Sequence, residues 1–194
     1  MSKPLLQIIV ASTRPGRVGA AVADWIRDRA GAHGGFAVEV VDLAEVDLPF
    51  LDEPHHPRLG RYVHQHTKDW SATVSRADAF VFVTPEYNHG YPAALKNAID
   101  FLHAEWQHKP VGFVSYGGVA GGTRAVQALK PVLASLKMVP AVAAVPIPFV
   151  ATHLDDGRFQ PTEALEAGAD AMLDELAEWT AALAPLRRQR SAAA

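Results

Sequence analysis

Five short apolar stretches alternate with amphipathic helical stretches along this chain, and that alternation is the feature that most restricts its fold. The apolar stretches are rich in branched residues and occupy Leu5–Ala11, Phe36–Leu43, Ala79–Thr84, Val111–Tyr116 and Pro140–Pro146. Apolar residues at helical spacing follow each of them. Repeated strand–helix units form a parallel sheet that helices cover on both faces. We therefore predict a three-layer α/β sandwich.

Right-handed crossovers make 2-1-3-4-5 the most economical order for five such strands. Glu39 in the second stretch indicates that this strand lies at an edge of the sheet. The 194 residues fit one domain, spanning 1–194, without a repeat or a linker. In such sheets, ligands bind beyond the carboxyl ends of the strands, between strands 1 and 3. The loops expected there are Ser12–Val18, Pro85–Tyr91 and Gly117–Gly122.

Composition excludes several kinds of function. With 18 basic and 21 acidic residues the net charge is −3, which gives no electrostatic reason to bind nucleic acid or a membrane surface. The chain has no cysteine, so disulfides, thiolate catalysis and dithiol redox chemistry are excluded, and any redox reaction needs a cofactor. The absence of cysteine is compatible with a cytoplasmic location. The first residues do not resemble a signal peptide, and no apolar run has the length of a membrane span.

The first of the three loops predicts a phosphate site. Its residues are Ser12, Thr13, Arg14, Pro15, Gly16 and Arg17, and a helix begins near Val18 and Gly19. Free N–H groups and the positive dipole end of a helix start favour a bound anion. The two hydroxyls can add donors and the two arginines can add charge. The simpler interpretation is that Ser12 or Thr13 caps the helix and both arginines are solvated.

The other two loops suit a planar ring that gains negative charge. The third strand is followed by Pro85, Glu86, Tyr87, Asn88, His89 and Gly90, and the fourth ends in Ser115, Tyr116, Gly117 and Gly118. Tyr87 offers a flat surface, and paired glycines let backbone N–H groups form an anion-binding concavity. Flavin mononucleotide (FMN) has this layout of phosphate and ring. Alternatively, Tyr87 and Tyr116 are packing residues and the glycine loop is a flexible turn.

Other motifs give weaker signals. The stretch from Gly117 resembles a nucleotide P-loop, but Thr123 stands where lysine is required. Several of the nine histidines cluster. His64 and His66 fall in a helix expected from about Leu59 to Ala77, where residues two apart point in different directions, so we expect no metal site. His89 lies in a site loop and either touches substrate or faces solvent.

Four pieces of the chain resemble the NADPH-dependent FMN reductase family of flavodoxin-like proteins, which includes quinone, azo-dye and chromate reductases. They are Ser12-Thr13-Arg14 with Arg17, Pro85-Glu86-Tyr87-Asn88-His89-Gly90, Leu95-Lys96-Asn97-Ala98-Ile99-Asp100, and Lys109-Pro110-Val111 with Ser115-Tyr116-Gly117-Gly118. The resemblance runs from about Leu5 to Val145. The second and third pieces are the most specific. Many family members have a second serine where this chain has Arg17-Val18.

The resemblance implies a flavodoxin-like fold and a cofactor site. Ser12, Arg14 and the backbone from Arg17 to Gly19 would hold the FMN phosphate. Pro85–Asn88 would border the isoalloxazine ring, and Ser115–Gly118 would face its pyrimidine side.

The resemblance also implies an activity and an assembly. NADPH or NADH would reduce the flavin, and a small acceptor would then be reduced, with no single catalytic side chain required. The family is typically dimeric or tetrameric, which makes the helices Pro92–His103 and Gly122–Lys137 candidate contact surfaces. Two alternatives remain: a flavodoxin-like electron carrier without its own substrate, and an α/β module that binds no flavin.

Overall fold

The computed structural model describes the backbone of residues 3–193 and the side chains of residues 3–189, and its centre is a parallel sheet. The strands are β1 (Leu5–Val10), β2 (Ala37–Asp42), β3 (Ala79–Pro85), β4 (Pro110–Tyr116), β5 (Val139–Pro140) and β6 (Val145–Ile147). They pair in the order β2-β1-β3-β4-β5, and β6 also pairs with β4. The predicted order is confirmed, with β2 at an edge.

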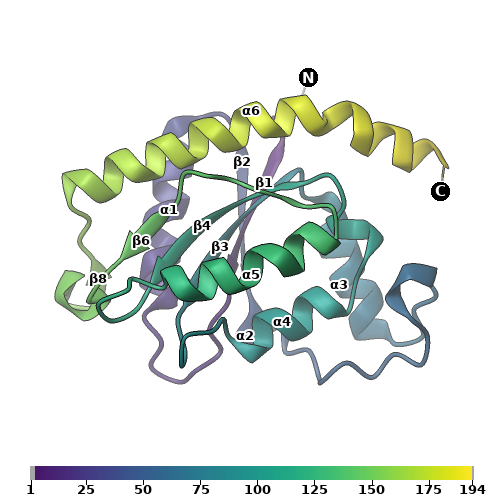
Figure 1. Cartoon of the computed structure of the whole chain (residues 1–194), viewed down its shortest axis with the longest axis horizontal. Coiled ribbons are helices and arrows are strands. Elements are labelled where there is room, and N and C mark those ends of the chain that lie inside the picture. Colours follow the sequence, from purple (N-terminus) through teal and green to yellow (C-terminus); the bar gives the residue numbers. More distant parts are fainter. Residues whose placement is uncertain (1–2, 194) are drawn as a thin grey trace.

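Helices cover both faces of this sheet (Figure 1). On one face lie α1 (Gly19–His33) and α6 (Glu163–Ala193), and on the other lie α3 (Gln65–Arg76), α4 (Ala93–Asp100) and α5 (Thr123–Ser135). Successive side chains of a strand point to opposite faces. Ile8 of β1 accordingly packs with α1 and α6, while Ile9 packs with the other three helices. The strands are therefore buried on both faces, as their continuous apolar runs predict.

The fifth strand differs from the prediction because it is divided. The expected strand Pro140–Pro146 is two short pieces, β5 and β6, on the same side of β4. Residues 141–144 stand opposite only Gly112 and Phe113, since Val111 pairs with Pro140 and Val114 with Val145. The extra residues leave the ladder, and Glu175 of α6 accepts hydrogen bonds from the N–H groups of Val142 and Ala143 at 2.8 and 2.7 Å.

The long segment before α3 also differs from the prediction. The helix expected from Leu59 begins at Gln65, and Leu59 and Val63 are more than half exposed. The segment contains only α2 (Leu43–Val46) and the short 3-10 helix η1 (Pro57–Leu59). Other short elements are η2 (Ala104–Trp106), η3 (Val150–His153) and the hairpin strands β7 (Leu154–Asp155) and β8 (Arg158–Phe159).

Candidate functional site

The three loops that follow β1, β3 and β4 meet at one edge of the sheet. The hydroxyls of Ser12 and Tyr87 lie 2.7 Å apart and join the first loop to the second. The N–H of Glu86 donates to the carbonyl of Tyr116 at 3.1 Å and joins the second to the third. A Cβ placed on Gly19 would lie 2.7 Å from the Tyr116 hydroxyl, so this tyrosine lies against the start of α1. Residues more than a hundred positions apart thus form one site.

The first loop leaves the start of α1 open. The N-cap residue of α1 is Val18, and no side chain caps the helix, so neither Ser12 nor Thr13 does. The N–H groups of Thr13 and Gly16 donate no hydrogen bond within residues 3–193. Arg14 is exposed, and its guanidinium has no partner among the described side chains. Unpaired donors and a positive charge at a helix start favour an anion.

The two arginines of this loop are not equivalent. Arg17 donates through Nη2 to Asp42 Oδ2 at 2.5 Å, and this carboxylate also accepts from the N–H of Ala44 at 2.9 Å. The charge of Arg17 is therefore balanced at the end of β2, while that of Arg14 is not. Asp42 is a residue that the sequence did not single out, because only the pairing of β1 and β2 brings it beside Arg17.

Two buried donors at this site have no partner. Among the described residues, five buried side-chain polar atoms lack a hydrogen bond, and two of them are Arg17 Nε and the Tyr116 hydroxyl. Tyr116 is 4% exposed, and its hydroxyl lies near Ser12 without a well-directed hydrogen bond. Burial raises the pKa of Tyr116 well above its usual value, so the hydroxyl stays protonated. Unpaired buried donors are costly unless a ligand accepts from them.

In the second loop, the Glu86 side chain points toward α5. Its carboxylate accepts from Arg124 Nε at 2.5 Å and from the Arg124 N–H at 3.1 Å, and only 5% of the side chain is exposed. Burial alone raises the pKa of Glu86, but the hydrogen bonds and charge of Arg124 outweigh it and lower the pKa. Glu86 thus joins the loop to α5, and it can border a ligand only through its backbone.

Tyr87 and Asn88 remain accessible in this loop. Tyr87 is 38% exposed although its hydroxyl is held by Ser12. Asn88 is exposed and has a positive φ of 49°, which places it in a tight turn. Pro85 is the last residue of β3 and is buried. Tyr87 and Asn88 are therefore the two side chains of the predicted motif that a ring could contact.

The third loop is held in place by the segment that follows β6. The N–H groups of Phe149 and Val150 donate to the carbonyls of Gly118 and Gly117, at 3.1 and 3.2 Å. The Gly117 N–H donates to the carbonyl of Ile147 at 3.3 Å, whereas the Gly118 N–H has no partner within residues 3–193. A Cβ on Gly118 would meet no atom within 4 Å. Of the two amides predicted to face the ring, the Gly118 amide is the free one.

Two further residues of this loop are structural. Ser115 is buried and donates through Oγ to the Gly121 carbonyl at 2.8 Å. Gly122 has a φ of +82°, and a Cβ there would lie 2.7 Å from that of Ser115 and 2.8 Å from the Tyr116 nitrogen. Glycine is required at this position because both the conformation and the space exclude a side chain. Ser115 thus stabilises the loop through its hydrogen bond to Gly121.

A cleft of about 580 Å³ adjoins the first loop at Thr13. Its walls are formed by two segments: the chain after β2, with Leu43, Ala44, Asp47, Leu48, Pro49 and Phe50, and the first turns of α4, with Ala93, Ala94, Asn97 and Ala98. The volume lies within the range of small-molecule sites, and most of the lining is apolar. Part of the long segment between β2 and α3 is therefore a wall of the site region.

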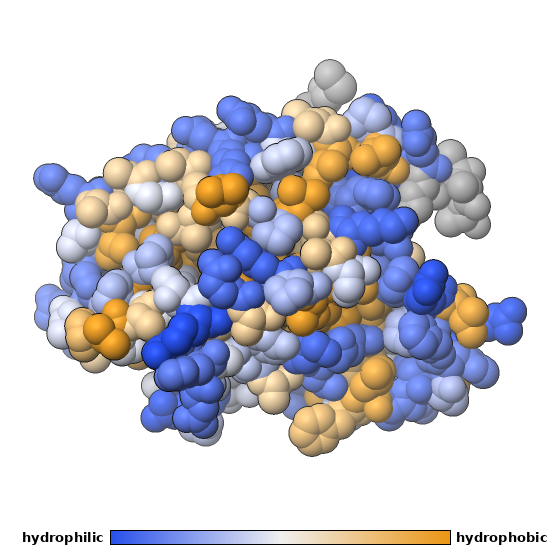
Figure 2. Space-filling model, viewed as in Figure 1, coloured by the Kyte–Doolittle hydropathy of each residue, from blue (hydrophilic) through white to orange (hydrophobic). Residues whose placement is uncertain are grey.

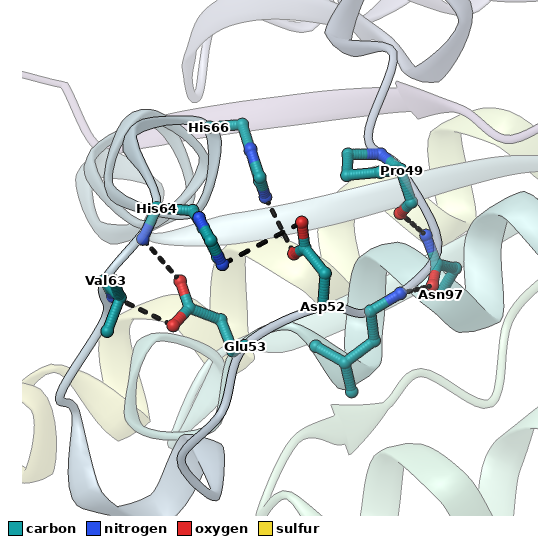
Figure 3. A network of polar contacts seen from close by, with 8 residues as sticks. Pro49, Asp52, Glu53, Val63, His64, His66 and Asn97 are labelled. Carbon is teal, nitrogen blue, oxygen red and sulfur yellow. Dashed lines mark hydrogen bonds and ion pairs between the residues drawn. The ribbon is translucent and has the colours of Figure 1, made fainter.

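A polar network holds residues 47–64, which we call the strap (Figure 3). Asn97 of α4 donates to the Pro49 carbonyl at 2.7 Å and accepts from the Leu51 N–H at 3.0 Å. Glu53 accepts from the N–H groups of Val63 and His64 at 2.8 and 3.0 Å. One end of the strap is thus bonded to α4, and Glu53 bonds its middle to its other end. The family resemblance could have indicated Asn97 from the sequence, because Asn97 lies in one of the pieces that carry it.

The expectation that His64 and His66 point apart is wrong. His64 precedes α3 in extended conformation, and the two rings stack with centroids 5.2 Å apart. Both approach Asp52, with Nε2–Oδ distances of 2.9 Å for His66 and 4.0 Å for His64 (Figure 3). Among the described residues, no group of three or more His, Cys, Asp or Glu side chains is arranged to hold a metal ion.

The residues present fit a phosphorylated planar cofactor. Buried unpaired donors and an open helix start suit its phosphate, and an exposed tyrosine with a free glycine amide suits a polar ring. The edge of the sheet between β1 and β3 is where this topology binds such ligands. The fold and the site define a flavodoxin-like α/β protein of the FMN-binding type.

Comparison with known proteins agrees with this class. A model of the NADPH-dependent FMN reductase family matches residues 4–152, so the chain belongs to that family. An NAD(P)H-dependent FMN reductase of Schizosaccharomyces pombe is 44% identical over 149 residues, which cover 75% of this chain and 74% of the relative. An FMN-dependent NADPH-azoreductase of Staphylococcus saprophyticus is 30% identical over 159 residues, covering 78% and 81%.

A solved structure shows the same fold. The flavoenzyme FerB of Paracoccus denitrificans, an NAD(P)H:acceptor oxidoreductase, superposes with a TM-score of 0.72 at 22% identity, covering 91% of this chain and 97% of that one. Family membership makes this chain an oxidoreductase that uses FMN with NADPH or NADH, and it favours the enzyme over the electron carrier. Among the described residues, no helix is both long and apolar enough to cross a membrane.

Proposed function

We propose that this protein oxidises NADPH or NADH and passes the electrons, through FMN at the three-loop site, to a quinone-like, azo or other small acceptor. The observation that carries the proposal is the convergence of the loops around unpaired donors. Ser12, Tyr87 and Tyr116 contact one another or lie close together beside the open start of α1. The relatives named as FMN reductase and NADPH-azoreductase support the choice of acceptor classes.

The proposed cofactor shell has three parts. The phosphate is held by Ser12, Thr13, Arg14 and Arg17, the backbone of Val18 and Gly19, and the Tyr116 hydroxyl. The ring is bordered by Pro85, the backbone of Glu86, and Tyr87 and Asn88, while its pyrimidine side faces Ser115, Gly117 and Gly118. Arg14 supplies the main uncompensated charge because Arg17 is paired with Asp42. Charge-assisted hydrogen bonds of this kind are the strong ones.

The protein itself acts by orientation and electrostatics. Bound FMN supplies the chemistry of accepting and donating a hydride. The chain holds the ring beside the cleft and offers the Gly118 amide to the charge that develops on the ring. No acid or base is needed to reduce the ring, so we expect no side chain to be indispensable for that step.

The absorption spectrum of the purified protein tests this proposal. We expect flavin bands in the visible range that bleach rapidly when NADPH or NADH is added without oxygen, and that return when a quinone is added. A flavin-loaded protein that the nicotinamides do not bleach would instead be an electron carrier. A colourless preparation that does not take up FMN would contradict the site itself.

We also propose a homodimer or homotetramer in the cytoplasm. A groove of about 450 Å³ lies between α4 and α5, beside Leu51, which is 42% exposed. Phe50 next to it is 86% exposed. The view onto α4 and α5 shows hydrophobic side chains interspersed with hydrophilic ones (Figure 2). The absence of cysteine is compatible with a reducing compartment. Light scattering after size-exclusion chromatography tests the assembly, and a monomer would contradict it.

A further inference from the structure

The tip of the second loop is a strained two-residue turn. Tyr87 and Gly90 exchange backbone hydrogen bonds of 2.9 and 3.0 Å, and between them Asn88 and His89 have φ angles of +49° and +66°. Such turns favour Asn at the first position and Gly at the second, because only glycine adopts a positive φ without strain. A histidine at the second position carries strain that glycine would avoid, which is consistent with a function for its side chain.

Arg124 determines which nitrogen of this histidine carries the proton. Arg124 Nη1 lies 2.8 Å from His89 Nε2. A guanidinium can only donate, so Nε2 must accept, and the ring is neutral with its proton on Nδ1. Arg124 is itself fixed by the buried carboxylate of Glu86. The pair Glu86–Arg124 thus holds His89 in one tautomer.

The remaining N–H of His89 is free at the edge of the site. His89 is exposed, and no described residue accepts from its Nδ1. The turn directly follows Glu86, which lies beside the third loop, since a Cβ on Gly117 would lie 3.7 Å from that of Glu86. The structure therefore presents a neutral, oriented donor on the loop that is proposed to border the ring.

We infer that His89 is a substrate-binding residue whose Nδ1–H donates a hydrogen bond to the acceptor, and that Arg124 is its positioning residue. This inference rests on the proposed function. A quinone takes up a hydride at one oxygen, and the charge that develops on the other oxygen is neutralised by a proton from water, giving a hydroquinone. His89 stabilises that charge and keeps its own proton. When the acceptor is an azo compound, the charge that develops on an azo nitrogen must be stabilised in the same way.

The test separates the two halves of the reaction by stopped flow. In His89→Gly, which relieves the strain and therefore folds, we expect the rate of oxidation by p-benzoquinone to fall about three- to tenfold, as for loss of one hydrogen bond. Oxidation by ferricyanide, which takes electrons without a proton, stays unchanged, as do FMN affinity and reduction by NADPH. His89→Asn, which tolerates the turn and keeps an N–H donor, restores part of the quinone rate.

A spectroscopic measurement tests the positioning role without turnover. Nitrogen-15 NMR of the protein before FMN is added should show the His89 proton on Nδ1, and Arg124→Leu should remove that preference. The inference would be overturned if the unsubstituted protein carried the proton on Nε2. It would also be overturned if His89→Gly left the rate of oxidation by quinone unchanged, or lowered the rate of oxidation by ferricyanide equally. Weaker FMN binding in His89→Gly would also overturn it, since the side chain would then hold the cofactor. Failure of the unsubstituted protein to bleach with NADPH would instead refute the proposed function.

Discussion

The phosphate loop (residues 12–18) and the strap (residues 47–64) lie at the same edge of the sheet. The polar groups of the strap are paired within the protein, whereas several donors of the phosphate loop are not. In the strap, Asn97 and Glu53 each pair with two backbone groups. In the phosphate loop, no side chain caps the start of α1, and the Arg14 guanidinium has no partner among the described residues. The strap is stabilised by contacts within the described chain, whereas we propose that the unpaired donors of the phosphate loop bind a ligand.

This difference shows why residue type alone is a poor guide to the site. The strap and the start of α3 contain four histidines, which by composition suggest metal or acid–base chemistry. The rings of His64 and His66 instead pack on one another and approach Asp52, and His56 accepts from the Arg58 N–H. The phosphate loop contains no histidine, and its function is indicated by the hydrogen bonds that its donors do not make. Unsatisfied buried groups are rare in native proteins, and one that lies beside an open helix start, as Arg17 Nε does, favours a bound anion.

The largest effect that separates the two regions is expected from Arg14→Ala. Loss of a charge-assisted hydrogen bond to phosphate costs about 1.5–3 kcal/mol, so FMN affinity should fall about 10- to 100-fold. Stability without FMN should not change, because the Arg14 side chain makes no hydrogen bond or ion pair with the described residues. Fluorescence titration of FMN measures the affinity. Arg61→Ala, an exposed arginine of the strap, is the matched control, and equal losses in both variants would remove Arg14 from the site.

Much of this arrangement follows from the sequence, because the strand–helix alternation implies the sheet order, and the order implies which loops meet. The contacts Arg17–Asp42 and Glu86–Arg124 do not follow, since each joins side chains whose rotamers depend on the packed fold. The division of the fifth strand into β5 and β6 also could not be predicted from the sequence. Pro140–Pro146 is apolar throughout, so a register shift of two residues changes nothing in its pattern.

Asn97→Ala should lower stability and leave FMN affinity little changed, which is the reverse of the effect expected for Arg14→Ala. It removes both the donor to Pro49 and the acceptor for Leu51, so we expect the free energy of unfolding to fall by about 1–2 kcal/mol. FMN affinity should change much less than in Arg14→Ala. Urea denaturation measures the first quantity. Asn97→Asp separates the two bonds, because a carboxylate still accepts from Leu51 but repels the Pro49 carbonyl. An unchanged urea midpoint in both variants would contradict the role given to the strap.

Glu53→Gln should be destabilising by about 1 kcal/mol at neutral pH, since an amide has one acceptor oxygen for two N–H groups. Burial alone raises the pKa of Glu53, but the bonds from Val63 and His64 outweigh it and lower the pKa below its usual value. A carboxylate with a lowered folded-state pKa stabilises the fold above its unfolded pKa, and this contribution is lost as pH falls through the folded pKa.

The pH dependence of that difference is the measurement. The gap in urea midpoint between the unsubstituted protein and Glu53→Gln should be full at pH 7 and should close below about pH 4. Glu45→Gln, an exposed glutamate nearby, should show no gap at either pH. A gap that persists in acid would mean that the introduced amide disturbs packing, and that the charge of Glu53 is not what holds the strap.

The smallest effect is expected from Asp52→Asn, which tests whether the histidine pair belongs to the same framework. Asp52 and His66 are 39% and 31% exposed, and exposed ion pairs contribute about 0–1 kcal/mol. The amide oxygen can still accept from His66, so the urea midpoint should move less than in Glu53→Gln. A loss as large as that of Asn97→Ala would mean that the two rings and Asp52 fix the strap together, and would extend the network from backbone contacts to the histidines.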